Sequence, residues 1–148
     1  MQTKFDRSLP LALGSDHAGF EYKEALKAIL AAEGWAIEDV GTHSAASTDY
    51  PDYAHPVAQM VEDGKAAAGI LVCGSGNGVC MTANKHKGIR AALCWNEDVA
   101  ALARQHNNAN VLCLPERFVS LELAKKMAEI FLSTEFEGGR HERRVEKI

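Results

Sequence analysis

The sequence predicts an α/β fold, a three-layer sandwich around a five-stranded parallel sheet, with a short C-terminal helix. Five short apolar runs alternate with segments of helical spacing, which is the order of βαβ units. Most of the runs are apolar throughout, as is typical of strands buried on both faces of a parallel sheet. The 148 residues are close to the ~150 of a typical domain. We therefore expect one Rossmann-like domain over residues 1–148.

The predicted strands are the five apolar runs. They cover Leu9–Leu13, Trp35–Val40, Ala68–Cys73, Ile89–Trp95 and Asn110–Leu114. The longest apolar stretch, Ala66–Cys73, is far shorter than the ~18 residues of a membrane-spanning helix. The N-terminus MQTKFDRSLP lacks the apolar region of a signal peptide. We therefore expect a cytoplasmic protein with no membrane partner.

Five helices are predicted between and after the strands. They cover Phe20–Glu33, His55–Lys65, Asn77–His86, Glu97–His106 and Ser120–Thr134. Lys23 and Lys27 are expected on the outer face of the first helix. Asn96 and Ser120 are suited to cap the fourth and fifth helices.

The C-terminal segment 137–148 follows a different pattern. A glycine pair precedes a short charged helix whose only apolar residues are Val145 and Ile148. Because two apolar side chains stabilise little on their own, this helix either frays or packs on a partner subunit.

Charge and cysteine usage exclude several kinds of partner. Lys and Arg number 16, and Asp and Glu number 20, which gives a net charge of −4. Nucleic-acid and anionic-membrane binding usually leave a basic footprint, so we expect neither. The four cysteines form no C-x-x-C pair and fit no zinc spacing. The sequence therefore predicts free thiols and a reducing compartment.

The segment from Cys73 to Gly78 is the main candidate for chemistry, because ligands of open α/β sheets lie beyond the carboxyl ends of the strands. Three alternate glycines there allow backbone N–H groups to approach an anion, although a plain tight turn has the same pattern. The spacing fits neither the dinucleotide fingerprint nor the Walker loop, and a C-x5-R phosphatase would need arginine where Val79 stands. A helix N-terminus can make Cys73 a base or nucleophile. From composition alone, all three cysteines within apolar runs are interpreted as small buried hydrophobes: Cys73, Cys94 and Cys113. For Cys73 this is the alternative to a chemical role.

Polar residues follow other predicted strands. Asp16 and His17 come after the first strand, where a carboxylate beside an imidazole can hold sugar hydroxyls, neutralise phosphate or shuttle a proton. The alternative is that Asp16 caps the next helix and His17 is solvated. Arg117 follows the fifth strand at the same edge.

The C-terminal third adds a histidine and two arginines. His106 ends the fourth helix, where the helix dipole alone favours a cation. Arg140 and Arg144 stand four residues apart, hence on one helix face that suits either a phosphate or plain solvation. Three histidines have no polar constellation around them and are interpreted as structural or surface residues: His43, His55 and His86.

Six segments together resemble a known family. They are GSDHAGF (14–20), TDYPDYA (48–54), GILVCGSGNGVCMTANK (69–85), GIRAAL (88–93), RQHNNANVL (104–112) and EGGRHERRVEKI (137–148). In order and spacing they resemble the type B ribose-5-phosphate isomerases, within the wider family that includes galactose-6-phosphate isomerase subunits. The resemblance implies interconversion of D-ribose 5-phosphate and D-ribulose 5-phosphate through an enediolate, with no metal or organic cofactor.

The resemblance also implies roles for the candidate residues. Cys73 is the base that moves a proton from C2 to C1, His106 opens the sugar ring, and Ser75 helps to move protons between O1 and O2. The enediolate is stabilised by the amides of Gly74, Ser75, Gly76, Asn77 and Gly78. Sugar oxygens are held by Asp16 and Asn107, and phosphate by His17, Arg117, Arg140 and Arg144. In this family each site is shared by two subunits, which implies a homodimer or a tetramer.

Two positions separate branches of the family. Some relatives lack the cysteine and use a glutamate where Val79 stands, so this chain matches the thiol branch. Galactose-6-phosphate isomerase subunits often lack the histidine at the position of His106, so its presence favours a pentose isomerase. A hexose 6-phosphate substrate such as allose 6-phosphate remains an alternative, as does a non-catalytic subunit that binds a sugar phosphate.

Overall fold

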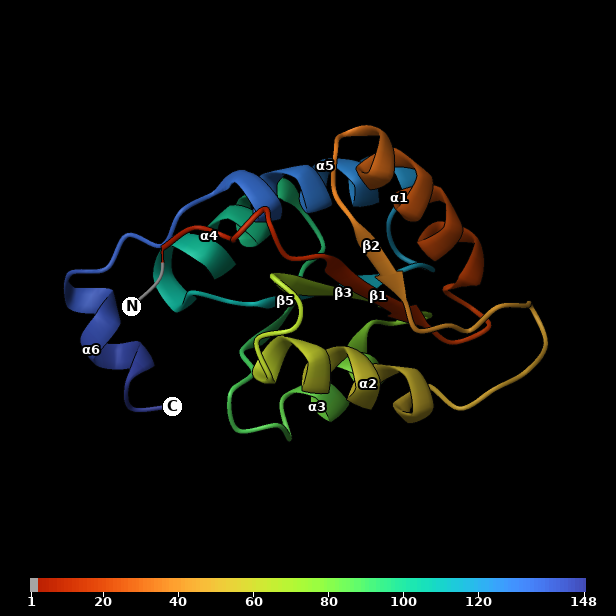
Figure 1. The fold of residues 1–148 in the computed structure, drawn as a ribbon, viewed down its shortest axis with the longest axis horizontal. Helices are drawn as coiled ribbons and strands as arrows, with labels where there is room; N and C mark the ends of the chain where they lie inside the picture. The colour runs from red at the N-terminus through yellow and green to blue at the C-terminus, as the bar shows by residue number, and fades with distance from the viewer. Residues whose placement is uncertain (1–2) are drawn as a thin grey trace.

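A computed structural model describes residues 3–148 of the protein (Figure 1). Strands and helices alternate along the chain until the last two helices. The elements are β1 (Leu11–Ser15), α1 (Phe20–Ala32), β2 (Ile37–Asp39), α2 (Pro51–Glu62), β3 (Ala68–Cys73), α3 (Asn77–Ala83), β4 (Ala91–Leu93), α4 (Glu97–Asn107), β5 (Val111–Pro115), α5 (Leu121–Ser133) and α6 (Arg140–Val145).

The five strands form one parallel sheet between two helical layers. The strand order is β2-β1-β3-β5-β4, and every pairing is parallel. Helices α1, α4 and α5 cover one face of the sheet, and α2 and α3 cover the other (Figure 1). The predicted fold class is therefore confirmed. Because β2 lies on one side of β1 and β3 on the other, the winding direction reverses between β1 and β3, where α/β sheets of this kind bind ligands.

The core consists of two apolar layers, one on each face of the sheet. Alternate strand residues such as Leu13 and Val72 pack under α1, α4 and α5. Their neighbours Leu71 and Cys73 belong to the layer under α2 and α3. The period of two along β3 thus places the thiol of Cys73 on the α2–α3 face.

The predicted strands agree with the structure best in the middle of the sheet. The prediction for Ala68–Cys73 is confirmed, and β1, β3 and β5 are buried along their whole length. β1 lies two residues later than predicted and β5 one residue later. The edge strands β2 and β4 have three residues each and are only partly buried, so the longer predicted limits are wrong. Each of these strands pairs with only one neighbour, so the residues predicted beyond its three paired positions have no strand partner.

Two helix predictions need correction. α2 begins at Pro51, four residues before the predicted start, because proline has the fixed φ that suits the first helical turn. α3 ends at Ala83, and the chain continues in tight turns in which Lys85 N–H donates to Thr82 O and His86 N–H to Ala83 O. The caps are confirmed: the side chains of Asn96 and Ser120 accept hydrogen bonds from the amides three residues later.

The C-terminal helix α6 packs against the end of α4, so it is not frayed. His141 and Val145 are 8% and 6% exposed, whereas Ile148 is 83% exposed. α6 lies beyond the end of the sandwich (Figure 1). Across residues 3–148, the helices are all too short or too polar to span a membrane.

Candidate active site

Cys73 is the last residue of β3 and begins the glycine-rich loop. It is buried, with 4% of its surface exposed. The Gly76 N–H donates a hydrogen bond to Cys73 Sγ at 3.2 Å. A donor in this position stabilises negative charge on sulfur, and the thiolate is the form of cysteine that acts as a base or nucleophile.

The loop conformation depends on Gly76. Its φ of +74° lies in the left-handed region, and an added Cβ would come within 2.4 Å of Leu93 Cδ1. The next amide, that of Asn77, donates to Ser75 Oγ at 3.2 Å. Because the amides of Gly76 and Asn77 have acceptors inside the loop, Gly74, Ser75 and Gly78 are the better placed donors for a bound anion.

Asp16 and His17 lie at the same edge of the sheet as Cys73. Ser15 is level with Val72 in the sheet, so the next residues along each strand, Asp16 and Cys73, are level too. Asp16 Oδ1 accepts a hydrogen bond from Gly19 N–H at 3.1 Å in the turn before α1. The N-cap of α1 is Gly19 and no side chain caps this helix, so the capping alternative for Asp16 is wrong. His17 Nδ1 accepts from Thr48 N–H at 3.2 Å, which places the proton of the neutral ring on Nε2.

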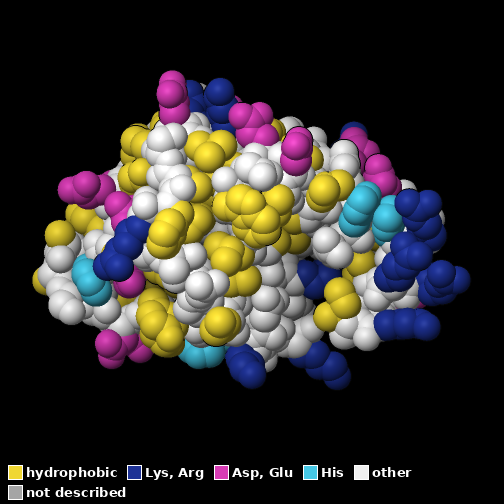
Figure 2. All heavy atoms as spheres, turned by 180° about the vertical axis from the view of Figure 1, so that it is seen from behind, with side chains coloured by type: hydrophobic (Ala, Val, Ile, Leu, Met, Phe, Trp, Pro, Cys, Tyr) yellow, Lys and Arg dark blue, Asp and Glu magenta, His cyan; other side chains and the backbone are white. Residues whose placement is uncertain are grey.

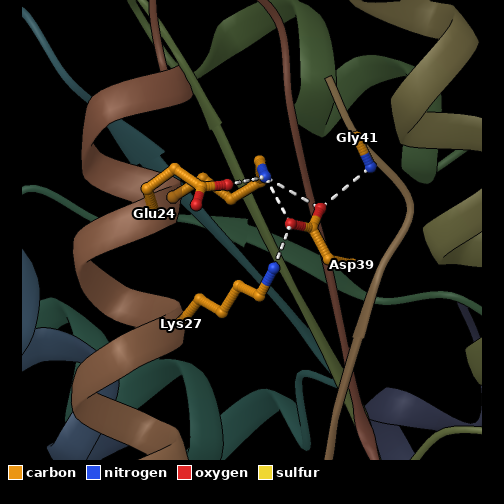
Figure 3. Close-up of polar contacts among 5 residues, drawn as sticks. Glu24, Lys27, Asp39 and Gly41 are labelled. Atoms are coloured by element: carbon orange, nitrogen blue, oxygen red, sulfur yellow. Dashed lines mark hydrogen bonds and ion pairs between the residues drawn. The ribbon is translucent and has the colours of Figure 1, made fainter. Parts of the chain in front are cut away.

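A buried ion-pair cluster lies between α1 and the end of β2 (Figure 3). Lys23 Nζ, with 1% of its side chain exposed, is 2.7 Å from Asp39 Oδ2, and Lys27 Nζ is 3.1 Å from the same oxygen. Asp39 Oδ1 also accepts from Gly41 N–H at 2.9 Å. Burial opposes ionisation of Asp39, but the hydrogen bonds from Lys23, Gly41 and Lys27 outweigh it and hold the pKa of the carboxyl below its ordinary value. The expected outward orientation of Lys23 is wrong.

This cluster fixes the backbone next to Asp16. Ser15 N–H donates to Gly41 O at 2.9 Å, and Thr42 N–H donates to Ser15 O at 2.8 Å. The loop after β2 is thus fastened to the end of β1 from both directions. The Lys23–Asp39 pair therefore supports the position of Asp16 without contacting the loop at Cys73.

Arg117 completes this group. The backbone N–H of Arg117 donates to Gly74 O at 3.0 Å, and a Cβ added to Gly74 would lie 3.2 Å from Arg117 Nε. The exposed guanidinium thus lies against the backbone of the glycine-rich loop. We call this group the Cys73 half-site: Asp16, His17, residues 73–78 and Arg117.

The remaining candidates lie at the other end of the sheet. His106 and Asn107 end α4, and Arg140 and Arg144 are exposed on α6. Figure 2 shows Lys and Arg side chains gathered beside histidines at the end of the molecule that carries α6. We call this group the His106 half-site: His106, Asn107, Arg140 and Arg144.

His106 packs against two residues that were not among the candidates. Its ring stacks on that of His141, with ring centroids 4.2 Å apart and planes 13° from parallel. Glu137 Oε1 is 3.7 Å from His106 Nε2 and 3.5 Å from His141 Nε2. Burial, followed by repulsion from His106 and Arg140, lowers the pKa of His141, and Glu137 opposes this effect. Although the sequence predicted no metal cluster, three of these atoms lie close enough together to hold an ion.

Arg104 supports the His106 half-site and was not singled out from the sequence. It is 1% exposed, and its guanidinium donates to Asn108 Oδ1 and to the carbonyls of Ala109 and Thr134. Burial lowers its pKa to about 10, which leaves it a cation at neutral pH. It therefore fastens the end of α4 to the segment that follows α5. Its place on an amphipathic helix gave no signal of burial, because arginine there usually faces solvent.

Two other histidines are surface residues, as interpreted, but the prediction that they have no polar neighbours is wrong. His55 Nδ1 and His86 Nε2 are 2.7 Å apart and share a hydrogen bond, and His86 Nδ1 is 3.8 Å from Glu62 Oε1. These residues thus form a polar cluster between α2 and the turn after α3. Their separation of 31 residues in sequence concealed it.

The buried cysteines match the sequence interpretation. Cys94 and Cys113 are fully buried, and burial raises the pKa of both thiols, that of Cys94 to about 12. A hydrogen bond with Cys113 lowers the pKa of Cys80. Cys94 and Cys113 are thus inert thiols at neutral pH.

The two half-sites cannot meet within one chain. Gly69 is level with Val111 and Cys73 with Pro115, so the start of β5 is four residues, or about 13 Å, from the level of Cys73. His106 precedes β5 and lies at the far edge of the sheet. The structure therefore assembles the predicted residues into two groups, not into a single site.

Comparison with known proteins identifies the family of the chain. The profile of the Ribose/Galactose Isomerase family matches residues 11–148. The ribose-5-phosphate isomerase B of Escherichia coli K12 is 47% identical over 138 residues, which cover 93% of each chain.

Solved structures are similar over nearly the whole chain. A ribose 5-phosphate isomerase from Thermotoga maritima has a TM-score of 0.92 at 52% identity and covers 94% of this chain and 96% of its own. Ribose-5-phosphate isomerase B from Mycoplasma genitalium, solved with bound ribulose-5-phosphate, has a TM-score of 0.91 at 46% identity, with 96% and 95% covered. The profile match and these likenesses together show that the chain belongs to the Ribose/Galactose Isomerase family.

Proposed function

We propose that the protein is a cofactor-independent aldose–ketose isomerase that interconverts D-ribose 5-phosphate and D-ribulose 5-phosphate. The observation that carries the proposal is the hydrogen bond from Gly76 N–H to Cys73 Sγ, at the switch point between β1 and β3. It places a backbone donor on the sulfur of the proposed base, beside the other amides of the loop, and proton transfer next to a carbonyl needs both a base and such donors. Relatives that bear this activity in their names are similar over nearly the whole chain.

The reaction begins with opening of the furanose ring. His106 donates a proton to the ring oxygen as the bond between C1 and that oxygen breaks, and the O1 hydroxyl passes its proton to solvent water as the C1–O1 double bond forms. This step yields the open aldehyde. Asp16 and Asn107 hold sugar oxygens during the step.

The thiolate of Cys73 then removes the proton from C2. The electron pair of that C–H bond forms the C1–C2 double bond, and O1 becomes negatively charged. Amides of the loop, with Gly74, Ser75 and Gly78 the freest to do so, donate to this oxygen; a single such donor is worth about 3 kcal/mol. Cys73 returns the proton to C1 while the Ser75 hydroxyl carries a proton from O2 to O1, which leaves the ketone at C2.

Phosphate binding uses hydrogen-bond donors of both half-sites. His17 and Arg117 come from one, and Arg140 and Arg144 from the other. The phosphate does not react, so its binding energy serves to position the sugar.

A shared site requires a second copy of the chain. We propose a homodimer in which the His106 half-site of one subunit faces the Cys73 half-site of its partner. Large apolar side chains near the carboxyl ends of the strands support it: Met81, Trp95 and Phe118 are 66%, 56% and 74% exposed. A reducing compartment such as the cytoplasm suits a thiol base.

The assignment is tested with purified protein, ribose 5-phosphate and excess EDTA. Ribulose 5-phosphate should form, and in D2O the recovered ribose 5-phosphate should carry deuterium at C2. Absence of turnover at high enzyme concentration contradicts the isomerase assignment. A subunit that only binds sugar phosphates would introduce no deuterium at C2, since binding requires no base.

The substrate alternative is tested by the ratio of kcat/KM for ribose 5-phosphate and allose 6-phosphate. We expect the pentose to be preferred, because one added carbon moves the reacting atoms relative to a fixed phosphate. A higher kcat/KM for the hexose would reassign the substrate.

A further inference from the structure

The cluster formed by His106, Glu137 and His141 is not explained by hydrogen bonding. Glu137 Oε1 is 3.7 Å from His106 Nε2 and 3.5 Å from His141 Nε2. Both separations exceed the ~2.7–3.2 Å of a good hydrogen bond. Three potential ligand atoms thus lie close together without bonding to one another.

These separations match those between ligands of a metal ion. Zinc bonds to histidine nitrogen at about 2.0–2.1 Å, so neighbouring ligands of a tetrahedral site lie about 3.3–3.4 Å apart. The three atoms lie within 4.8 Å of one another. The rings are stacked with planes 13° from parallel, so one ring must rotate out of the stack, with an inward movement of Glu137, to aim all three atoms at one ion.

A backbone hydrogen bond and a turn at two glycines bring these three groups together. Glu137 N–H donates to Gln105 O at 3.1 Å, which fastens the segment after α5 to the last turn of α4. Gly138 and Gly139, with φ of +66° and +56°, then turn the chain back so that the His141 ring stacks on His106. An added Cβ would meet no atom within 4 Å at either glycine, so conformation and not space calls for glycine there.

We propose that His106, Glu137 and His141 form a binding site for a divalent transition-metal ion of the zinc class, and that the bound ion blocks His106. Two imidazoles and one carboxylate form a zinc ligand set that leaves a coordination position open to water. The side chains of His106 and Glu137 are 40% and 51% exposed, so an ion can enter from solvent.

The surroundings select the kind of ion. Arg140 and Arg144 on α6 repel any cation, so the site needs strong bonds to nitrogen and is unsuited to Mg²⁺ or Ca²⁺, which prefer oxygen ligands. The blocking effect rests on the proposed role of His106 in ring opening, because a metal-bound nitrogen cannot carry a proton. Metal binding itself does not depend on that role.

The first test measures binding without reference to activity. Tag-free protein, freed of metal by EDTA and dialysed, is titrated with Zn²⁺ against a chromogenic chelator. We expect saturable binding at this site, weakened about tenfold or more in Glu137→Gln and in His141→Gln, since even outer groups of metal sites contribute at least tenfold. Circular dichroism confirms that each variant is folded, and Mg²⁺ should not compete.

Two control variants should keep the wild-type zinc affinity of the site. Glu135→Gln removes an exposed carboxylate two residues away that pairs with Lys4 at 2.9 Å. The His55→Gln/His86→Gln double variant removes the other pair of neighbouring histidines. Equal affinity in wild type, Glu137→Gln and His141→Gln overturns the proposal, as does zinc binding that is lost only in the double variant.

The second test measures the effect on catalysis. Micromolar Zn²⁺ should inhibit isomerisation of ribose 5-phosphate, EDTA should reverse the inhibition, and Glu137→Gln should require about tenfold more zinc relative to its own uninhibited rate. Zinc that fills the site without slowing isomerisation contradicts the blocking effect. If the protein shows no isomerisation at all, the proposed function fails, whereas the binding titration still decides on the metal site.

Discussion

At the scale of single residues, the position of Cys73 Sγ distinguishes a base from a packed thiol. Cys94 and Cys113 are equally buried, but burial raises the pKa of both, whereas Cys73 alone receives a hydrogen bond from an amide of the glycine-rich loop. We expect Cys73→Ala to lower kcat for ribose 5-phosphate by about 10²- to 10⁴-fold, the usual contribution of a general base. KM should change little, because phosphate and hydroxyl contacts remain.

The matched control for this experiment is Cys80→Ala. Cys80 lies two residues beyond the loop, and its Sγ contacts Ala91 O at 3.4 Å and not the sugar site. In steady-state kinetics, the kcat of Cys73→Ala should be at least about 10²-fold lower than that of Cys80→Ala. A Cys73→Ala enzyme with the kcat of the control would assign the base to another residue.

Two glycines with similar φ allow conformational strain to be separated from steric contact. Gly76 and Gly138 have φ of +74° and +66°, but an added Cβ would meet Leu93 Cδ1 at 2.4 Å in the first case and nothing within 4 Å in the second. We expect Gly138→Ala to lower the free energy of unfolding by about 1–2 kcal/mol, the cost of a left-handed residue. Gly76→Ala should lower it further. Urea denaturation measures both, and equal losses would show that Leu93 moves aside without cost.

At the scale of elements, the Lys23–Asp39 pair links α1 to β2 and to the loop that reaches Ser15. Replacement of Lys23 by Met leaves Asp39, which is 7% exposed, with only Lys27 and the Gly41 N–H as donors. We expect a loss of about 3–5 kcal/mol of unfolding free energy, as when one partner of a buried pair is removed. Lys27→Met, on a side chain that is 42% exposed, should cost much less in the same urea titration.

The same cluster gives a pH dependence with a definite sign. Because the pKa of Asp39 is lower in the folded protein than its ordinary value of 3.8, its stabilising contribution is complete above that value. The contribution is lost as the pH falls through the lower folded value. Urea midpoints measured from pH 5 downwards should fall less steeply in Asp39→Asn than in wild type. Parallel slopes would show that the ion pair does not contribute to acid sensitivity.

The elements also show how far sequence patterns reach. The limits of β3 were predictable because every residue from Ala68 to Cys73 is apolar and the strand is buried on both faces. The predicted limits of the edge strands β2 and β4 were too long. The ends of these strands are set by pairing with a single neighbouring strand, which the apolar pattern does not show. The position of Lys23 was predicted wrongly for a related reason. A lysine on a helix is expected to face solvent, and its burial is stabilised by an ion pair with Asp39, which is distant in sequence.

At the scale of the whole molecule, sequence motifs identified the candidate residues but not their arrangement. Cys73 is predicted at the end of a strand and His106 at the end of the helix before the next strand, so their separation rests on the predicted parallel sheet and not on either motif. Parallel strands place all strand ends at one edge and the ends of the preceding helices at the other. The separation of the two half-sites thus follows from the direction of α4, while the contacts of α6 with His106 depend on a turn at two glycines.

That separation predicts complementation between two inactive variants. In a dimer of Cys73→Ala with His106→Gln, one shared site carries both substitutions and the other carries neither. Random mixing of equal amounts makes about half of the dimers mixed, each with one intact site, so about a quarter of wild-type activity should return. The measurement is the kcat for ribose 5-phosphate of each variant alone and of the two after joint unfolding and refolding.

A control mixture fixes the interpretation of the regained activity. Cys73→Ala refolded with a Cys73→Ala/His106→Gln double variant contains no intact site in any dimer, so it should stay inactive. If each site used Cys73 and His106 of the same chain, the first mixture would be as inactive as this control. Activity regained in the first mixture alone therefore requires that the two ends of the sheet meet across a subunit boundary. Within one chain, Cys73 and the start of β5 lie about 13 Å apart along the strands, which is too far for a single site.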